Sequence, residues 1–88
     1  MDKSVLQEAE QLINGERKSQ YGHVSASYKR IAQMWGAIIG CSVTPKQALM
    51  CMASLKMIRE DYAHKRDNLV DAAGYIGLVE HLNEPKPV

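Results

Sequence analysis

The sequence predicts an all-α protein, a four-helix bundle-like single domain, and two observations carry that prediction. Phe is absent and runs of β-branched residues are missing, so strand signals are poor. Ala, Met, Leu, Lys and Gln dominate instead, and these residues favour helices. Because 88 residues suffice for one small domain, we expect a single helical domain over residues 1–82 and a frayed tail over residues 83–88.

The first two helices are expected over residues 4–14 and 24–39. Ser4 and Gln7 have the spacing of a capping box, and Gly15 is a natural C-terminal stop. Gly40 closes the second helix in the same way. The second helix carries an apolar seam with alternating spacings of four and three residues, formed by Val24, Tyr28, Ile31, Trp35 and Ile38.

The third helix is expected to begin at Thr44 and Pro45 and to reach about Tyr62. Thr44 is a good N-cap, Pro suits the first helical position, and Gln47 completes a capping box. The fourth helix is expected to be capped by Asp67 or Asn68 and to end near residue 82. Its small residues, which would let another helix approach closely, are Ala72, Ala73, Gly74 and Gly77.

The third and fourth helices are apolar on almost every side. Lys56 is the only charge between residues 47 and 58, and Asp71 is the only charge between residues 68 and 79. A helix that is apolar all round must be buried all round, and this chain is too short to cover two such helices. We therefore expect a homo-oligomer, a dimer or tetramer, with this helical hairpin at its centre. Four methionines are expected to fill core gaps, Met34, Met50, Met52 and Met57.

The two lone charges are expected to face each other. If the third and fourth helices form an antiparallel hairpin about a turn near residues 63 and 64, residues at equal height have numbers adding to about 127. Lys56 and Asp71 satisfy that condition, and so do Arg59 and Asn68. A buried charge is costly unless it is paired or binds something. The four residues therefore form either an internal ion pair that holds the register or the polar floor of a ligand site.

The ligand-site interpretation gives these polar residues distinct roles. Lys56 and Arg59 lie one helical turn apart and could both contact a phosphate. Asn68 and Asp71 could bind a ribose or a base edge, and a ring from Tyr21 or Tyr75 could stack on the base. Further cations precede two helices. The complete candidate set is Arg17, Lys18, Tyr21, His23, Lys56, Arg59, Arg66, Asn68, Asp71 and Tyr75. The competing interpretation concerns the segments before the second and fourth helices, residues 16–22 and 63–66. In that interpretation both segments are solvated loops.

Several functional classes are disfavoured. Eleven basic and ten acidic residues nearly cancel, which gives no broad field for DNA or an anionic membrane. The cysteines and histidines lack metal-ligand spacing, and no nucleophile motif is present. We expect no metal, no cofactor and no catalytic residue. The N-terminus lacks the apolar segment of a signal peptide and no run is long enough to span a membrane, so a cytoplasmic location is expected.

Five short motifs resemble a phage and prophage family of small helical proteins of unassigned function. They are Arg17-x-x-x-Tyr21-Gly22, Tyr28-x-x-Ile31-Ala32-x-x-Trp35, Thr44-Pro45, Leu55-Lys56-x-x-Arg59 and Arg66-Asp67-Asn68-x-x-Asp71-x-x-Gly74-Tyr75. That family is similar in pattern to the all-α nucleotide pyrophosphohydrolases of the MazG and dimeric dUTPase type. Those enzymes bind magnesium through Glu-Glu-x-x-Glu and Glu-x-x-Asp. Here Asp67 and Asp71 echo the second motif, whereas Lys56 and Arg59 replace the first.

Exchanging carboxylates for cations would remove a metal site and keep affinity for phosphate. The resemblance therefore implies a phage-type, non-catalytic oligomer that binds a nucleotide in the infected host's cytoplasm and sequesters a nucleotide-derived immune signal. One alternative is a diverged MazG-like nucleoside triphosphate pyrophosphohydrolase, which would need Mg²⁺. The other is a helical protein-binding inhibitor module.

Overall fold

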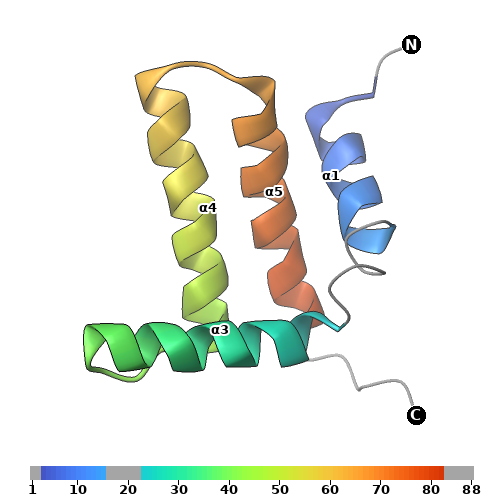
Figure 1. The fold of residues 1–88 in the computed structure, drawn as a ribbon. Helices are drawn as coiled ribbons and strands as arrows, with labels where there is room; N and C mark the ends of the chain where they lie inside the picture. The colour runs from blue at the N-terminus through green and yellow to red at the C-terminus, as the bar shows by residue number, and fades with distance from the viewer. Residues whose placement is uncertain (1–2, 16–22, 83–88) are drawn as a thin grey trace.

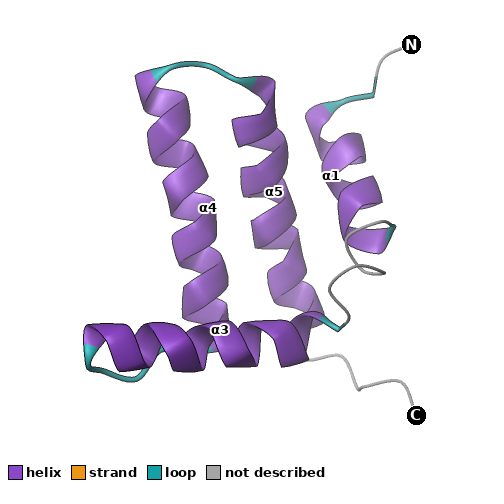
Figure 2. Ribbon diagram, viewed as in Figure 1, coloured by secondary structure: helices purple, strands orange, loops and turns teal. Residues whose placement is uncertain are grey.

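The structure is a computed structural model that describes residues 3–15 and 23–82, and every regular element in those ranges is an α-helix (Figure 1, Figure 2). The all-α prediction is therefore confirmed. Its helices are α1 (Val5–Asn14), α3 (Val24–Ile39), α4 (Pro45–Tyr62) and α5 (Arg66–His81).

Local capping chemistry sets most of the helix ends as the sequence predicts. The Ser4 hydroxyl accepts from the Gln7 backbone N–H at 3.1 Å, and the Gln7 side chain accepts from the Ser4 N–H at 2.9 Å. Thr44 and Gln47 repeat the same capping box at the start of α4, with Pro45 as its first residue. Gly40 ends α3 with φ of 88°, a left-handed conformation that favours glycine.

The start of α5 differs from the prediction. Lys65 is the N-cap and makes no side-chain capping bond, so Asp67 and Asn68 lie inside the first turn. The connector between α4 and α5 is only three residues long, which brings the first turn of α5 beside the last turn of α4. Glu60 of α4 uses that proximity and accepts the Lys65 backbone N–H at 2.9 Å. Glu60 therefore bonds the N–H of the N-cap residue itself, and the first turn of α5 has no side-chain cap of the kind expected from Asp67 or Asn68.

The helices form a flat arrangement with α5 at its centre. Figure 1 shows α4 and α5 as an antiparallel pair, α1 on the other side of α5, and α3 crossing the far ends of α4 and α5. The antiparallel hairpin predicted from the sequence is confirmed. The molecule measures 42 × 37 × 18 Å. Because one dimension is so short, a large share of the side chains remains at the surface.

The buried core is small and dominated by alanine. Its apolar members are Ala9, Ala32, Ala48, Leu49, Ala53 and Val70. Small side chains let the helices approach closely: a Cβ added to Gly77 would lie 2.7 Å from Cδ1 of Ile13, so α1 packs tightly on α5 there. At Gly74 nothing described lies within 4 Å of such a Cβ. The expected close approach thus occurs at Gly77 and not at Gly74.

Three of the four methionines predicted for the core are exposed in this chain: Met34, Met50 and Met57. Ile38, the last residue of the predicted seam on α3, is exposed as well. The reason is geometric. Helix α3 crosses α4 and α5 near their ends, so its C-terminal turn extends beyond them (Figure 1). Helix α4 packs on α5 along one side only, which leaves the positions of Met50 and Met57 uncovered.

Candidate functional site

The predicted contact between the two lone charges is present. Nζ of Lys56 lies 3.1 Å from Oδ2 of Asp71, across the interface between α4 and α5. Their side chains are 19% and 18% exposed. A pair this far from solvent gains more from its mutual attraction than a surface pair does, and it strongly penalises the loss of either partner. The ion pair therefore fixes the register of the hairpin.

One turn further along α4, Glu60 is the centre of a second polar cluster. Its Oε1 accepts from the Lys65 backbone N–H, and its Oε2 contacts Nδ1 of His64. The buried side chain of Asn68 donates through Nδ2 to Oε1 of Glu60 at 3.4 Å. The sequence placed Asn68 at the same height as Arg59, whereas its hydrogen-bond acceptor on α4 is Glu60. Glu60 was not among the residues expected to join the two helices. Its spacing of four residues from His64 could have indicated their contact.

The Glu60 cluster predicts how stability depends on pH. The hydrogen bond from His64, followed by that from the Lys65 backbone N–H, lowers the pKa of Glu60 below its ordinary value. A carboxyl group with a lowered folded-state pKa stabilises the protein fully above the ordinary carboxyl pKa. That contribution is lost as the pH falls through the lowered value. We expect wild type to resist urea better than Glu60→Gln at neutral pH and to lose that advantage on acidification.

Urea unfolding midpoints of both proteins, measured from neutral pH to about pH 3, check this expectation. Glu10→Gln, which changes an exposed carboxylate on α1, is the control. A Glu60→Gln defect that stayed constant or grew as the pH fell would contradict the proposed cause.

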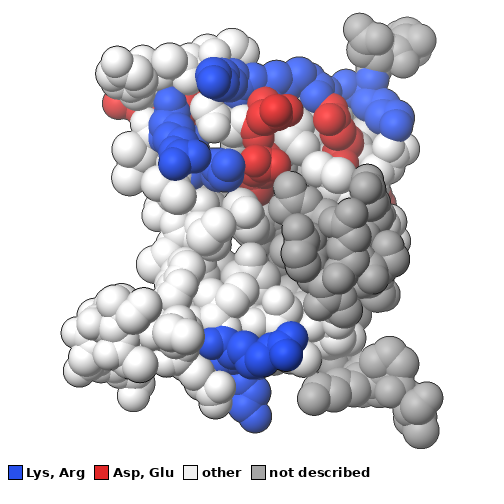
Figure 3. Space-filling view, viewed as in Figure 1, with Lys and Arg blue, Asp and Glu red and all other residues white. Residues whose placement is uncertain are grey.

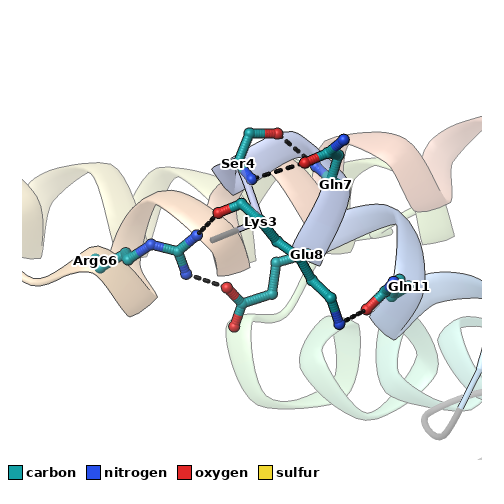
Figure 4. A network of polar contacts seen from close by, with 6 residues as sticks. All are labelled: Lys3, Ser4, Gln7, Glu8, Gln11 and Arg66. Carbon is teal, nitrogen blue, oxygen red and sulfur yellow. Dashed lines mark hydrogen bonds and ion pairs between the residues drawn. The ribbon is translucent and has the colours of Figure 1, made fainter. Parts of the chain in front are cut away.

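Arg66 is engaged in joining α1 to α5. Its Nη1 pairs with the carboxylate of Glu8, and its Nη2 donates to the Lys3 carbonyl at 2.7 Å (Figure 4). The figure also shows the Ser4–Gln7 capping box beside this contact and Lys3 reaching Gln11. Residues 8 and 66 are far apart in the sequence, which is why spacing alone gave Arg66 a ligand role. In the structure its guanidinium has structural partners.

The remaining candidates are dispersed. His23 is the N-cap of α3, where its Nδ1 accepts from the Ser25 backbone N–H at 3.2 Å. Tyr75 is half-buried one turn beyond Asp71 on α5. Arg17, Lys18 and Tyr21 lie outside the described residues. The structure thus brings Lys56, Asp71 and Asn68 together with Glu60 and places Arg66 at the start of α5.

Arg59 is the candidate cation that differs from Lys56 and Arg66, which both pair with carboxylates. It is exposed on α4, one turn after Lys56, and it forms no ion pair with any other residue of ranges 3–15 and 23–82. Figure 3 shows basic and acidic side chains gathered at the end of the molecule where α4 and α5 are joined, with an uncharged zone between them and a basic group on α3. The charged end of the hairpin is therefore the best-defined candidate site.

The described residues contain neither a metal-binding cluster nor a membrane-spanning helix. Residues 3–15 and 23–82 contain no group of three or more His, Cys, Asp or Glu side chains placed to hold a metal ion. Within the same ranges, no helix combines the length and apolar character that crossing a membrane requires. Both cysteines, Cys41 and Cys51, are free and exposed.

Comparison with known proteins places the chain in a family. The Gene 55 protein of Mycobacterium phage L5 is 38% identical over 85 residues, covering 94% of this chain and 54% of that protein. The Gene 55 protein of Mycobacterium phage D29 is 34% identical over 85 residues, covering 96% and 56%. The chain thus spans about half the length of these phage relatives. No solved structure matches it. The model of a domain of unknown function, DUF6378, matches residues 4–83, and the chain belongs to that family.

Proposed function

We propose that this chain binds a phosphate-bearing nucleotide at the charged end of the α4–α5 hairpin without hydrolysing it. The observation that carries the proposal is Arg59, an exposed guanidinium with no ion-pair partner in the described ranges and one helical turn from Lys56. A guanidinium forms bidentate hydrogen bonds with phosphate oxygens, and a lysine ammonium adds a point charge beside it.

The ion pair between Lys56 and Asp71 is compatible with that role. An ammonium group has three N–H donors, so Lys56 can stay on Asp71 and still donate to a phosphate oxygen. Asp71 in turn holds the ammonium in place before a ligand arrives, which reduces the entropy lost on binding. Tyr75 is half-buried one turn along α5 and is the aromatic residue closest in sequence to Asp71. In this proposal its ring stacks on the base of the nucleotide.

The phage relatives supply the biological setting of the proposal. In an infected cell, a non-catalytic binder of this kind would act by sequestering a nucleotide-derived signalling molecule of host immunity, in the host cytoplasm. Neither a cofactor nor Mg²⁺ is needed for sequestration. On the resemblance to MazG-like pyrophosphohydrolases that the sequence motifs suggest, Lys56 and Arg59 would stand where those enzymes carry carboxylates, and such a substitution would favour binding over hydrolysis. Magnesium-dependent turnover of a nucleoside triphosphate that is abolished in Asp71→Asn would overturn this assignment.

Calorimetry against cyclic dinucleotides, ADP-ribose derivatives and nucleoside triphosphates tests the site. We expect one of these ligands to bind wild type and Arg59→Ala to weaken that binding by about ten- to a hundredfold, the effect of one charge-assisted hydrogen bond. Because Arg59 is exposed, the thermal midpoint should stay close to that of wild type.

Arg30→Ala, which removes an exposed cation from α3, is the matched control and should bind as wild type does. Equal affinity of Arg59→Ala and wild type, equal losses in both variants, or no binding by any ligand of the panel would refute the site. Release of a bound nucleotide on heating the purified protein, detected by mass spectrometry, would identify the ligand directly.

A further inference from the structure

The side of the α4–α5 hairpin opposite the proposed nucleotide site carries four exposed apolar side chains in two matched stripes. On α4, Met50 and Met57 are 56% and 60% exposed. On α5, Leu69 and Ile76 are 39% and 60% exposed. Each pair is seven residues apart, which places its two members on one side of a helix, two turns from each other.

The two stripes lie on the same side of the hairpin. Leu49 and Lys56 are α4 positions turned toward α5, and Met50 and Met57 each follow one of them. Asn68 is an α5 position turned toward α4, and Leu69 follows it directly. One residue further along a helix is a rotation of about 100° in a constant sense. In antiparallel neighbours, that rotation moves both sets of side chains to the same side of the pair.

The apolar side chains of the two stripes also lie at matching positions along the helix axes. The contact between Lys56 and Asp71 gives a register in which the numbers of facing residues add to 127. Met57 with Leu69, and Met50 with Ile76, add to 126, within one residue of that register. The four apolar side chains therefore form two levels, separated by about 10 Å along the helices.

Two opposite charges extend the stripe of α4 at equal distances. Lys46 lies four residues before Met50, and Asp61 lies four residues after Met57. Both are exposed, and neither forms an ion pair within the described ranges 3–15 and 23–82. They are fifteen residues apart, about 22 Å along the helix, so they cannot pair within one chain. The spacings along Lys46, Met50, Met57 and Asp61 are the same in both directions. A second copy of α4 lying antiparallel would therefore place a methionine opposite each methionine and a carboxylate opposite each lysine.

We propose that this face, defined by Lys46, Met50, Met57, Asp61, Leu69 and Ile76, binds a second copy of the chain. The two copies are related by a two-fold axis perpendicular to the helices, and α4 packs antiparallel on α4 of the other copy. Met50 then lies opposite the second copy's Met57, Lys46 opposite its Asp61, and Leu69 opposite its Ile76. One axis satisfies all three matches, as an interface formed by the same surface on both partners requires.

This face is distinct from the proposed nucleotide site. Arg59 follows Met57 by two residues and therefore lies about 200° further around α4. Dimerisation and nucleotide binding are thus separate properties, and the loss of one leaves the other to be measured.

Sedimentation equilibrium of the intact chain and of charge-reversed variants tests the arrangement. We expect wild type to sediment as a dimer. Lys46→Asp and Asp61→Lys should each weaken the dimer by about tenfold, because each dimer contains two such pairs and each exposed pair contributes little. The double variant Lys46→Asp/Asp61→Lys should recover wild-type affinity, since it restores both pairs with reversed signs. Only contacts between copies can produce this recovery.

Apolar variants test the centre of the same face. Met57→Lys should weaken the dimer by about a hundredfold or more, because two lysines would then lie in the desolvated centre. Ile38→Lys changes a side chain that is 74% exposed on α3 and should leave the dimer intact. A wild-type monomer of 9.8 kDa at about 100 μM, well above the Kd of a stable dimer, would overturn the proposal. So would a Met57→Lys dimer as tight as wild type, or a double charge reversal without recovery.

Discussion

Asp71→Ala is expected to lower the free energy of unfolding by about 2–4 kcal/mol. It leaves the ammonium of Lys56 between α4 and α5 without its carboxylate partner, although that side chain is only 19% exposed. Breaking a fully buried pair typically costs about 3–5 kcal/mol, and the remaining exposure of this pair reduces the effect. Urea unfolding at one fixed protein concentration measures the loss, since self-association would otherwise contribute to the apparent stability.

A double-mutant cycle separates the pair from its surroundings. Lys56→Met replaces the ammonium with an apolar side chain of similar length and leaves Asp71 without the cation. The variant Lys56→Met/Asp71→Ala removes both charges, and we expect it to be more stable than the sum of the single losses predicts, by at least about 1 kcal/mol. Strict additivity would show that the two groups, 3.1 Å apart, do not stabilise each other in solution.

Leu49→Ala is expected to cost about 2–5 kcal/mol, because it removes three carbon atoms and leaves a cavity that only partly collapses. Leu49 is 0% exposed and is one of the two largest fully buried side chains. Most of the other buried apolar residues are alanines, so few side chains nearby are long enough to fill the space. A loss of this size is a large fraction of the stability of a small domain.

Ile58→Ala on the same helix is the matched control for Leu49→Ala. Ile58 is 67% exposed, and we expect its truncation to change stability by less than about 1 kcal/mol. Thermal and urea unfolding of the two variants provide the comparison. Similar losses for both would mean that Leu49 is not the centre of the core and that α4 packs in a different orientation.

Spacing along the chain was sufficient to predict features that depend on residues within one or two turns. The capping boxes at Ser4 and Thr44 and the stop at Gly40 were predicted because their hydrogen bonds join groups three or four residues apart. Lys56 and Asp71 were matched because an antiparallel hairpin with a short connector has one register. In a helical hairpin, the capping residues and the helical repeat therefore suffice to predict a contact between the two helices.

The tertiary structure decided everything that depends on the positions of non-neighbouring helices. The partner of Arg66 is Glu8, on a helix at the other end of the chain, and no spacing rule links them. Asn68 is bonded to Glu60 because the short connector brings the two helix ends together. Met50 and Met57 are exposed because neither α5 nor α3, the helices that contact α4 in the described ranges, covers their side of it. An apolar sequence records that a side chain favours burial, whereas the crossing of α3 and the flat arrangement of the helices determine which apolar side chains this chain can cover by itself.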